Sequence, residues 1–250
     1  MNAKVAVLVY PGTNSENETL RALLDAEVDA ELVHWSNAAT LANFDAYVLP
    51  GGFAYEDRIR AGAIAAHDRM TDAVIEGAQK GKMVLGICNG AQVLLEAGLV
   101  PGTGPVRRPT AAFTKNAPSG KFVCKHVYVK LNIAPQRCAI TAGLPGEALI
   151  PAWAAHGEGR LAGSADHLDE ISHGGHLAFV YAHADGSVDD AAVPNGSALG
   201  AAALTNSQGN VLAIMPHPER DAWTFNHPFS RDGRSGMTFF HSFAKGLKQQ

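Results

Sequence analysis

The strongest constraint on the fold lies in residues 83–96, MVLGICNGAQVLLE, where a short apolar run passes directly into a helical pattern. Residues 83–87 are apolar and β-branched in part, which is typical of a buried strand. After a three-residue turn, residues 91–97 favour a helix that Gly98 is placed to close. The segment therefore predicts a buried strand, a tight turn and a helix.

Cys88 lies in that turn, between Gly86 and Gly90. Glycines at these positions remove the side chains that would crowd a tight, exposed turn, the geometry with which serine hydrolases present their nucleophile. The following helix directs its unpaired N–H groups and positive dipole end at the sulfur, which favours the thiolate. We therefore interpret Cys88 as a nucleophile. On this stretch alone, the alternative is a small cysteine that only packs.

The first hundred residues alternate between strand and helix patterns. The expected strands are 4–10, 31–34, 46–49 and 83–87, and the expected helices run from a Ser15–Glu18 capping box to about residue 26 and over 63–78. This order predicts an α/β fold with a doubly wound, mostly parallel sheet of the flavodoxin-like kind. We expect a single domain over residues 1–250, because no linker or repeat divides the chain.

The second half of the chain predicts an irregular, more antiparallel excursion. Residues 101–120 are rich in Pro, Gly, Lys and Arg, which favours a loop. The further expected elements are strands at 122–132, 149–154, 177–182 and 211–215, a polar insert at 156–175 and a final helix at 236–246. Their order in the sheet does not follow from the sequence.

Composition narrows the class of protein. The chain of 250 residues has a net charge of −4, which does not favour a nucleic-acid or anionic-membrane partner. Three cysteines without close spacing indicate a reducing compartment, and we expect a cytoplasmic protein without signal peptide or membrane span. No metal site is predicted, because the His173–His176 stretch lacks a third ligand.

Two further stretches stand at strand ends. Gly51-Gly52-Phe53 follows the third expected strand, and its glycines let the backbone approach a ligand. The carboxyl ends of parallel strands share one edge, so this turn and Cys88 are expected to border one pocket.

His217 and Glu219 follow the last strand in Pro216-His-Pro-Glu. In extended chain their side chains point the same way, so the carboxylate can orient the imidazole that an activated thiol needs.

The segments 86–92, GICNGAQ, and 217–219, HPE, resemble the class I glutamine amidotransferases. More narrowly, the chain resembles the PurQ family, the glutaminase subunits of phosphoribosylformylglycinamidine synthase. Four segments carry this resemblance in family order: 50–65, 88–94, 155–159 and 215–220. Ala54, Glu56 and Arg58 replace the serine, glycine and bulky apolar residue usual in the family, and Ala91 stands where a larger residue is common.

The resemblance implies a mechanism in which Cys88 attacks the side-chain amide of L-glutamine, His217 transfers protons and Glu219 orients His217. The backbone N–H of Asn89 and one from the Gly51–Phe53 turn are the expected oxyanion donors, and the family favours Gly52 for the second. The further candidates for substrate binding are Gly51, Phe53, Gln92 on the helix and His156 at the pocket rim.

The same resemblance implies partners. The sequence has no Walker A motif and no dinucleotide fingerprint, so we expect no cofactor in this chain. ATP and magnesium are expected in a large PurL-like synthetase subunit that receives ammonia, with a small PurS-like subunit beside it. The Trp- and Arg-containing segment 221–236 is a hypothetical contact with the large subunit; the alternative is a self-packed loop.

Two other functions stay open. A stand-alone thiol hydrolase or peptidase of the related elbow-cysteine group is one, although in much of that group a histidine directly follows the nucleophile, where this chain has Asn89. A non-catalytic regulatory domain of the same fold is the other, although the chain retains Cys88, His217 and Glu219.

Overall fold

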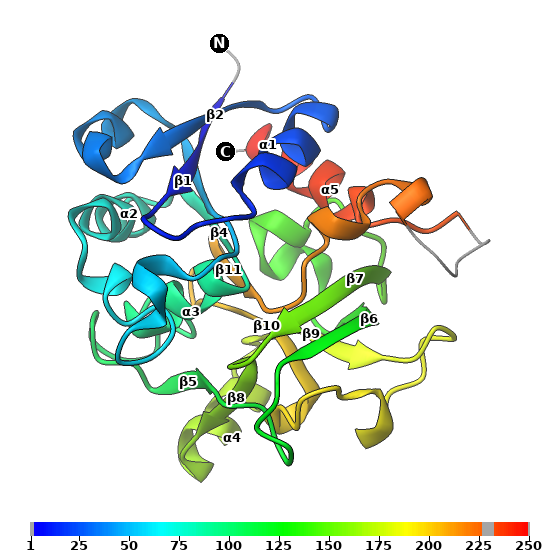
Figure 1. Ribbon diagram of the computed structural model, residues 1–250. Helices are drawn as coiled ribbons and strands as arrows, with labels where there is room; N and C mark the ends of the chain where they lie inside the picture. Colours follow the sequence, from blue (N-terminus) through cyan, green and yellow to red (C-terminus); the bar gives the residue numbers. More distant parts are fainter. Residues whose placement is uncertain (1–2, 227–232, 250) are drawn as a thin grey trace.

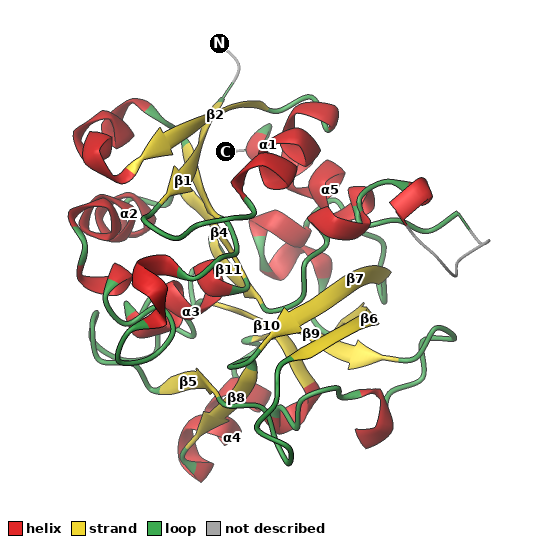
Figure 2. Cartoon of the chain, in the orientation of Figure 1, coloured by secondary structure: helices red, strands yellow, loops and turns green. Residues whose placement is uncertain are grey.

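The computed structural model describes residues 3–226 and 233–249 and contains one large mixed sheet with helices on its faces (Figures 1 and 2). The strands are β1 Lys4–Val9, β2 Asp29–His34, β3 Ala46–Leu49, β4 Met83–Ile87, β5 Ala111–Thr114, β6 Val123–Leu131, β7 Leu149–His156, β8 Arg160–Gly163, β9 Leu177–Ala182, β10 Ala201–Thr205 and β11 Val211–Ile214. The α-helices are α1 Glu16–Asp25, α2 Arg69–Gln79, α3 Asn89–Glu96, α4 Ala165–His173 and α5 Met237–Leu247.

The large sheet has nine strands in the order β2-β1-β3-β4-β11-β10-β9-β6-β7, and its first five are parallel. Every residue of β3 and β4 is buried. Helices cover both faces of this parallel half, with α1 against α5 on one side and α2 and α3 on the other (Figure 1). Continuous apolar strands are what such double cover requires, and the predicted doubly wound α/β fold is confirmed.

The other half of the sheet is antiparallel, as expected. β10 pairs with β11 and β9, and β6 pairs with β9 and β7. The sequence missed β10, whose AAALT has few β-branched residues and whose strand form depends on its two neighbours. The loop predicted at 101–120 contains β5, which pairs with β8 from the predicted polar insert, and α4 follows in that insert.

The helix that begins after β1 lacks its predicted cap. Ser15 precedes α1, but its side chain makes no capping hydrogen bond, so the Ser15–Glu18 capping box is wrong. The Ser15 hydroxyl instead accepts a hydrogen bond of 2.9 Å from the Arg220 guanidinium. The start of this helix is thereby tied to the segment that follows β11.

The helix predicted over 63–78 begins later than expected. Asp68 accepts a 2.7 Å hydrogen bond from the Met70 N–H and so caps α2, which starts at Arg69. Residues 65–67 form a separate 3₁₀ turn. Over the ranges 3–226 and 233–249, the helices are too short or too polar to cross a membrane.

Candidate active site

The predicted nucleophile turn is present between β4 and α3. Cys88 adopts φ +51° and ψ −106°, a conformation that an L-residue holds only when its surroundings enforce it. A Cβ atom on Gly86 would lie 2.6 Å from the Gly90 carbonyl oxygen, and one on Gly90 would lie 2.0 Å from the Leu49 carbonyl oxygen. The close packing of β3, β4 and α3 therefore requires both glycines.

The turn is less exposed than predicted, since Cys88 is only 6% exposed. Two segments cover it. At the end of β7 the Ala155 carbonyl oxygen lies 3.8 Å from Sγ, and after β11 the His217 imidazole lies near enough for the Cys88 charge to raise its pKa. Cys124 is exposed, whereas burial raises the pKa of the Cys138 thiol. Cys88 is thus the cysteine that the fold places against a histidine.

His217 and Glu219 are in direct contact, with 2.5 Å between Nδ1 and Oε1, and both side chains are buried. The backbone of His217 exchanges hydrogen bonds of 2.8 and 3.1 Å with Trp153 of β7. The extended path predicted through Glu219 is wrong, because Pro218 is helical (φ −70°, ψ −28°) and Glu219 opens a 3₁₀ turn. The carboxylate still reaches the imidazole, by a bent chain.

The charges around His217 fix its protonation. Burial lowers the pKa of this imidazole, but the charge of Glu219 and then that of Cys88, with hydrogen bonds to both, outweigh burial and raise the pKa to about 10. Nδ1 is taken by Glu219, which leaves Nε2 for the sulfur. A protonated imidazole beside the sulfur, with a carboxylate behind it, is the arrangement that stabilises a thiolate.

The turn after β3 lies beside the nucleophile. Thr13 and Gly52 form an antiparallel bridge, in which the Phe53 N–H donates to the Gly12 carbonyl at 2.9 Å. In this kind of pair the flanking residues exchange the hydrogen bonds, so the N–H of Gly52 itself points away from Thr13. Because β3 lies between β1 and β4, that direction is the β4 side of the sheet, and Cys88 directly follows β4.

Gly51 and Phe53, the neighbours of Gly52, differ in how they lie relative to the candidate nucleophile. A Cβ atom on Gly51 would lie 2.5 Å from Cε1 of His217, so only glycine fits at this position. Phe53 is 49% exposed and lies at the outer edge of the turn. Its N–H is already used within the chain, which excludes it as an oxyanion donor in this arrangement.

The side chains of Asn89 and Gln92 hydrogen-bond the first turn of α3 to the neighbouring loops. Asn89 accepts from the Ala54 N–H at 2.9 Å and donates to Asp57 at 3.0 Å and to Gln92 at 2.9 Å. Gln92 in turn donates to the Glu158 carbonyl at 2.6 Å. Both ends of the buried Gln92 amide are engaged within the chain, which favours a positioning role over the predicted hydrogen bond to substrate.

His156 does not lie at a pocket rim, as the sequence had suggested, because it is only 3% exposed at the end of β7. Burial, and then the charge of His217, lower its pKa to about 4, so the ring is neutral. Its Nδ1 is 3.2 Å from Oδ1 of Asn116. A Cβ atom on Gly159 would lie 2.3 Å from the ring, so this glycine makes room for the imidazole.

Three residues near the site carried no motif in the sequence. Asn116, from the predicted loop, and Asn195 bind the backbone of the loop between β7 and β8 at Gly159. Tyr181 of β9 is fully buried, and burial and then the charge of Cys88 raise the pKa of its phenol. Isolated polar residues in loops and strands give no periodic signal, so only the tertiary structure reveals them.

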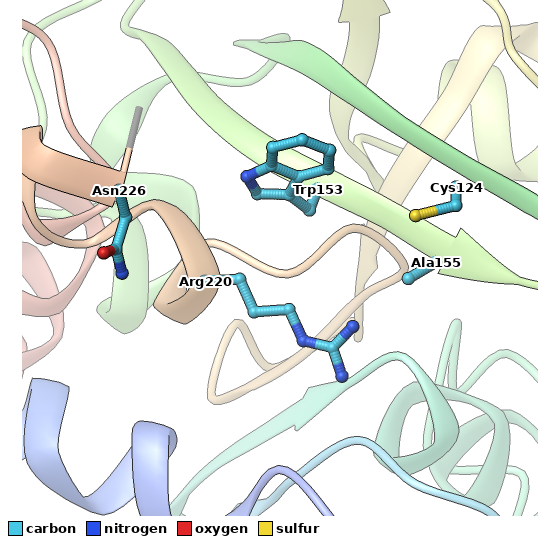
Figure 3. Close-up of a pocket in the computed structure, with 5 residues that line it drawn as sticks. All are labelled: Cys124, Trp153, Ala155, Arg220 and Asn226. Atoms are coloured by element: carbon cyan, nitrogen blue, oxygen red, sulfur yellow. The ribbon is translucent and has the colours of Figure 1, made fainter. Parts of the chain in front are cut away.

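A pocket of about 310 Å³ opens beside these groups and is shown in Figure 3. Its lining residues are Cys124, Trp153, Ala155, Arg220 and Asn226. Trp153 and Ala155 are the residues of β7 that contact His217 and Cys88 through their backbones, so the pocket adjoins the candidate nucleophile. Arg220 supplies positive charge at its wall (Figure 3).

The predicted coupling segment 221–236 lies partly outside the described residues, and Phe229 and Arg231 are among those not described. Trp223 donates to an Asp25 oxygen at 2.9 Å, and Arg234 donates to the Ala184 carbonyl at 2.9 Å. These contacts favour the self-packed alternative for both residues.

Among the described residues, no group of three or more His, Cys, Asp or Glu is arranged to hold a metal ion. His176, from the stretch that was considered for a metal, is buried, and its Nδ1 is 3.1 Å from the Thr205 carbonyl oxygen.

Comparison with known proteins agrees with this geometry. Residues 2–245 match the CobB/CobQ-like glutamine amidotransferase domain. The chain is 38% identical over 218 residues to the phosphoribosylformylglycinamidine synthase subunit PurQ of Aquifex aeolicus, covering 87% of this chain and 90% of that one. It is 36% identical to PurQ of Pyrococcus horikoshii, covering 98% and 99%.

A solved structure extends this likeness to three dimensions. The structure of PurLQS from Thermotoga maritima contains a chain with a TM-score of 0.78 and 30% identity, covering 97% of this chain and 98% of that one. Similarity in sequence and in fold runs over nearly the whole length of both chains. The chain therefore belongs to the PurQ family of phosphoribosylformylglycinamidine synthase subunits, within the glutamine amidotransferases.

Proposed function

We propose that this chain is the glutaminase subunit that hydrolyses L-glutamine to glutamate and ammonia through a thioester on Cys88. The observation that carries the proposal is the buried His217–Glu219 pair against a cysteine on a strained turn. A cysteine that only packs needs neither the φ of +51° nor a protonated imidazole beside it. The family membership supports the same substrate class.

In the first half of the reaction the Cys88 thiolate attacks the side-chain amide carbon of glutamine. The N–H of Gly52 and the N–H of Asn89, next after the nucleophile, bind the oxyanion. His217 then gives its proton to the departing nitrogen, and ammonia leaves as the tetrahedral intermediate collapses to the thioester. Gly51 and Phe53 border the bound substrate.

In the second half water attacks the thioester carbon. His217, now neutral, takes one proton from the water, and the carbon–sulfur bond breaks to release glutamate and restore the thiolate. Glu219 holds the imidazole by Nδ1 throughout, so that Nε2 faces the reacting atoms.

The ammonia passes to a PurL-like synthetase subunit that converts formylglycinamide ribonucleotide to formylglycinamidine ribonucleotide with ATP and magnesium in that partner. A small PurS-like subunit completes the complex, and we place it in the cytoplasm. The likeness to a chain of PurLQS supports this assembly. In this proposal residues 1–250 form one amidotransferase domain.

The test is labelling with an electrophilic glutamine analogue. It should modify Cys88 on the strained turn and spare the exposed Cys124 of β6 and the buried Cys138. In the assembled synthase, Cys88→Ala should abolish the use of glutamine and spare the reaction driven by added ammonia. Labelling spread over all cysteines would contradict the assignment.

The same assays separate the alternatives. A stand-alone thiol hydrolase or peptidase would cleave other amides without a synthetase, and a regulatory domain would release no glutamate with or without one. Glutamate release that depends on Cys88 and rises with the synthetase subunit supports the glutaminase.

A further inference from the structure

His156 ends β7 on its buried face, and only one of its two ring nitrogens has a hydrogen-bond partner in the part of the chain that the structure describes. Nε2 is the nitrogen without a partner, although it is buried. Buried polar atoms are nearly always hydrogen-bonded, and exceptions gather at functional sites. The position therefore requires an explanation.

The tautomer of this ring follows from its surroundings. Oδ1 of Asn116 accepts the backbone N–H of Gly159 at 3.1 Å, and Nδ2 of Asn116 donates to the carbonyls of His156 at 2.8 Å and of Lys121 at 2.9 Å. Oδ1 is thus an acceptor, and Nδ1 of His156 must donate to it. In the neutral ring Nε2 is then a hydrogen-bond acceptor.

Two observations place His156 beside the reacting groups. The residue before it, Ala155, directs its carbonyl to within 3.8 Å of the Cys88 sulfur, and the charge of His217 acts on the His156 ring. The Nδ1 edge of the ring lies against Asn116 and Gly159, which leaves Nε2 as the nitrogen that can face a substrate or water.

We propose that Nε2 of His156 accepts a hydrogen bond from the water that hydrolyses the Cys88 thioester. This inference rests on the proposed glutaminase function. The water oxygen forms a bond to the thioester carbon, one of its protons goes to His217, and the carbon–sulfur bond breaks. The other O–H proton points to His156 and stays on the product carboxyl group, which loses it to solvent.

Such an acceptor matters more for hydrolysis of the thioester than for its formation. The leaving nitrogen is held in place by its bond to the substrate, whereas the attacking water is held only by hydrogen bonds. A water that donates one hydrogen to His217 can still rotate about that hydrogen bond. A second hydrogen bond to the neutral His156 imidazole stops this rotation, and His156 does not take the proton that His217 accepts.

The experiment uses the full chain assembled with its synthetase subunit and compares thioester formation with hydrolysis by rapid quench. His156→Phe removes the acceptor and keeps the ring. We expect thioester formation within about twofold of the parent and hydrolysis slower by roughly tenfold to a hundredfold, so that the thioester accumulates. Hydroxylamine, a stronger nucleophile that needs no general base, should restore turnover as γ-glutamyl hydroxamate.

Two variants separate this role from packing. His176→Phe replaces another buried histidine, outside the site, and should leave the ratio of the two steps unchanged. His156→Gln places an amide oxygen near the position of Nε2 and should recover part of the hydrolysis rate.

Equal slowing of both steps in His156→Phe, or failure of hydroxylamine to restore turnover, would overturn the proposal and leave the glutaminase assignment intact. Should the parent chain form no thioester on Cys88, the glutaminase function itself would be wrong. If His156→Phe does not fold, Asn116→Ala, which frees the ring to change tautomer, should show the same shift toward accumulated thioester.

Discussion

The two sides of the candidate site are built by different means. The elbow side, from β3, β4 and α3, is held by backbone: Cys88 has a strained conformation and Gly90 lies against the Leu49 carbonyl. The wall side, from β7 and the loop to β8, is held by side chains, through Asn116 and Asn195. A glycine packed directly against backbone leaves no room for an added atom, whereas a side chain can be lost at the cost of its hydrogen bonds. We therefore expect changes on the elbow side to abolish the site and changes on the wall side to tune it.

The largest effect is expected from Gly90→Ala. The new Cβ atom would lie 2.0 Å from the Leu49 carbonyl oxygen, so α3 or β3 must move and carry Cys88 with it. We expect glutaminase turnover to fall by about 100-fold or more, because a shift of 1 Å at a nucleophile has that effect. The free energy of unfolding should fall by roughly 1–3 kcal/mol, as for other overpacked sites.

Urea unfolding and analogue labelling of Cys88 measure both effects. Gly146→Ala is the control, because a Cβ atom there meets nothing within 4 Å. Turnover of Gly90→Ala within twofold of the parent would show that the elbow side adapts as readily as the wall side.

The elbow side was also the more predictable from sequence. The strand, the turn with Cys88 and the helix follow each other within fourteen residues, so the local pattern indicates all three. The contact of His217 with Glu219 spans two residues and was predicted, although the helical Pro218 between them was not. The short spacing of His217 and Glu219 indicated that their side chains meet. The backbone conformation between them depends on packing against β7, which the sequence does not indicate.

The wall side could not be predicted in the same way. His156 and Asn116 are forty residues apart in sequence, and their contact needs β5, β7 and β8 to assemble first. Gln92 was expected to hydrogen-bond the substrate, but its side chain accepts from Asn89 and donates to the Glu158 carbonyl. Glu56, where the family usually has glycine, has φ +60°, in the left-handed region that glycine adopts most readily.

The second-largest effect tests the junction of the two sides, where His217 bridges to β7. Glu219→Gln preserves the shape of the side chain and removes the charge that keeps His217 protonated. Turnover should fall by roughly 100-fold, because the thiolate loses its imidazolium partner. Glu219→Asp should also slow turnover, since the shorter side chain draws the carboxylate away from Nδ1. Equal rates for Asp and Glu would contradict a direct contact.

The same variant should change the pH dependence of stability. The pKa of His217 is raised from 6.5 in the unfolded chain to about 10 in the folded one, so the linked stabilisation is complete below pH 6.5 and is lost as the pH rises through about 10. In Glu219→Gln the free energy of unfolding should therefore fall less steeply between about pH 7 and 10. Asp189→Asn, which removes a carboxylate from the partly exposed His183, is the control in urea unfolding.

A smaller effect is expected from Asn195→Ala on the wall side. This buried side chain donates to the Gly159 carbonyl at 2.7 Å and accepts from the Ser197 N–H at 3.1 Å, so its loss should cost about 1–3 kcal/mol of stability. Turnover should fall only a few fold, because the nucleophile turn is untouched. Asn210→Ala, which loses comparable buried hydrogen bonds near β4 and β11, should match it in stability and leave turnover unchanged. A 100-fold loss of turnover in Asn195→Ala would remove the contrast between the two sides.

The smallest effect concerns Asp57, which stands between the two sides. Its carboxylate accepts a hydrogen bond from Asn89 on the elbow side. Burial raises the pKa of Asp57 to about 6; the Asn89 hydrogen bond lowers this pKa, and the charge of Glu158 on the wall side raises it. Because the folded chain holds this proton more tightly than the unfolded chain, stability falls as the pH rises from about 4 to about 6 and stays lower above that.

Asp57→Asn keeps an oxygen that can accept from Asn89 and removes the charge. Above pH 6 the variant should be more stable than the parent, by less than about 1 kcal/mol since the group is only half-buried, and near pH 4 the two should converge. Urea unfolding at pH 4, 6 and 8 measures the difference, with Asp29→Asn at an exposed position of β2 as the control. A variant less stable than the parent at pH 8 would mean that the Asp57 charge holds the elbow and the wall together rather than straining their contact.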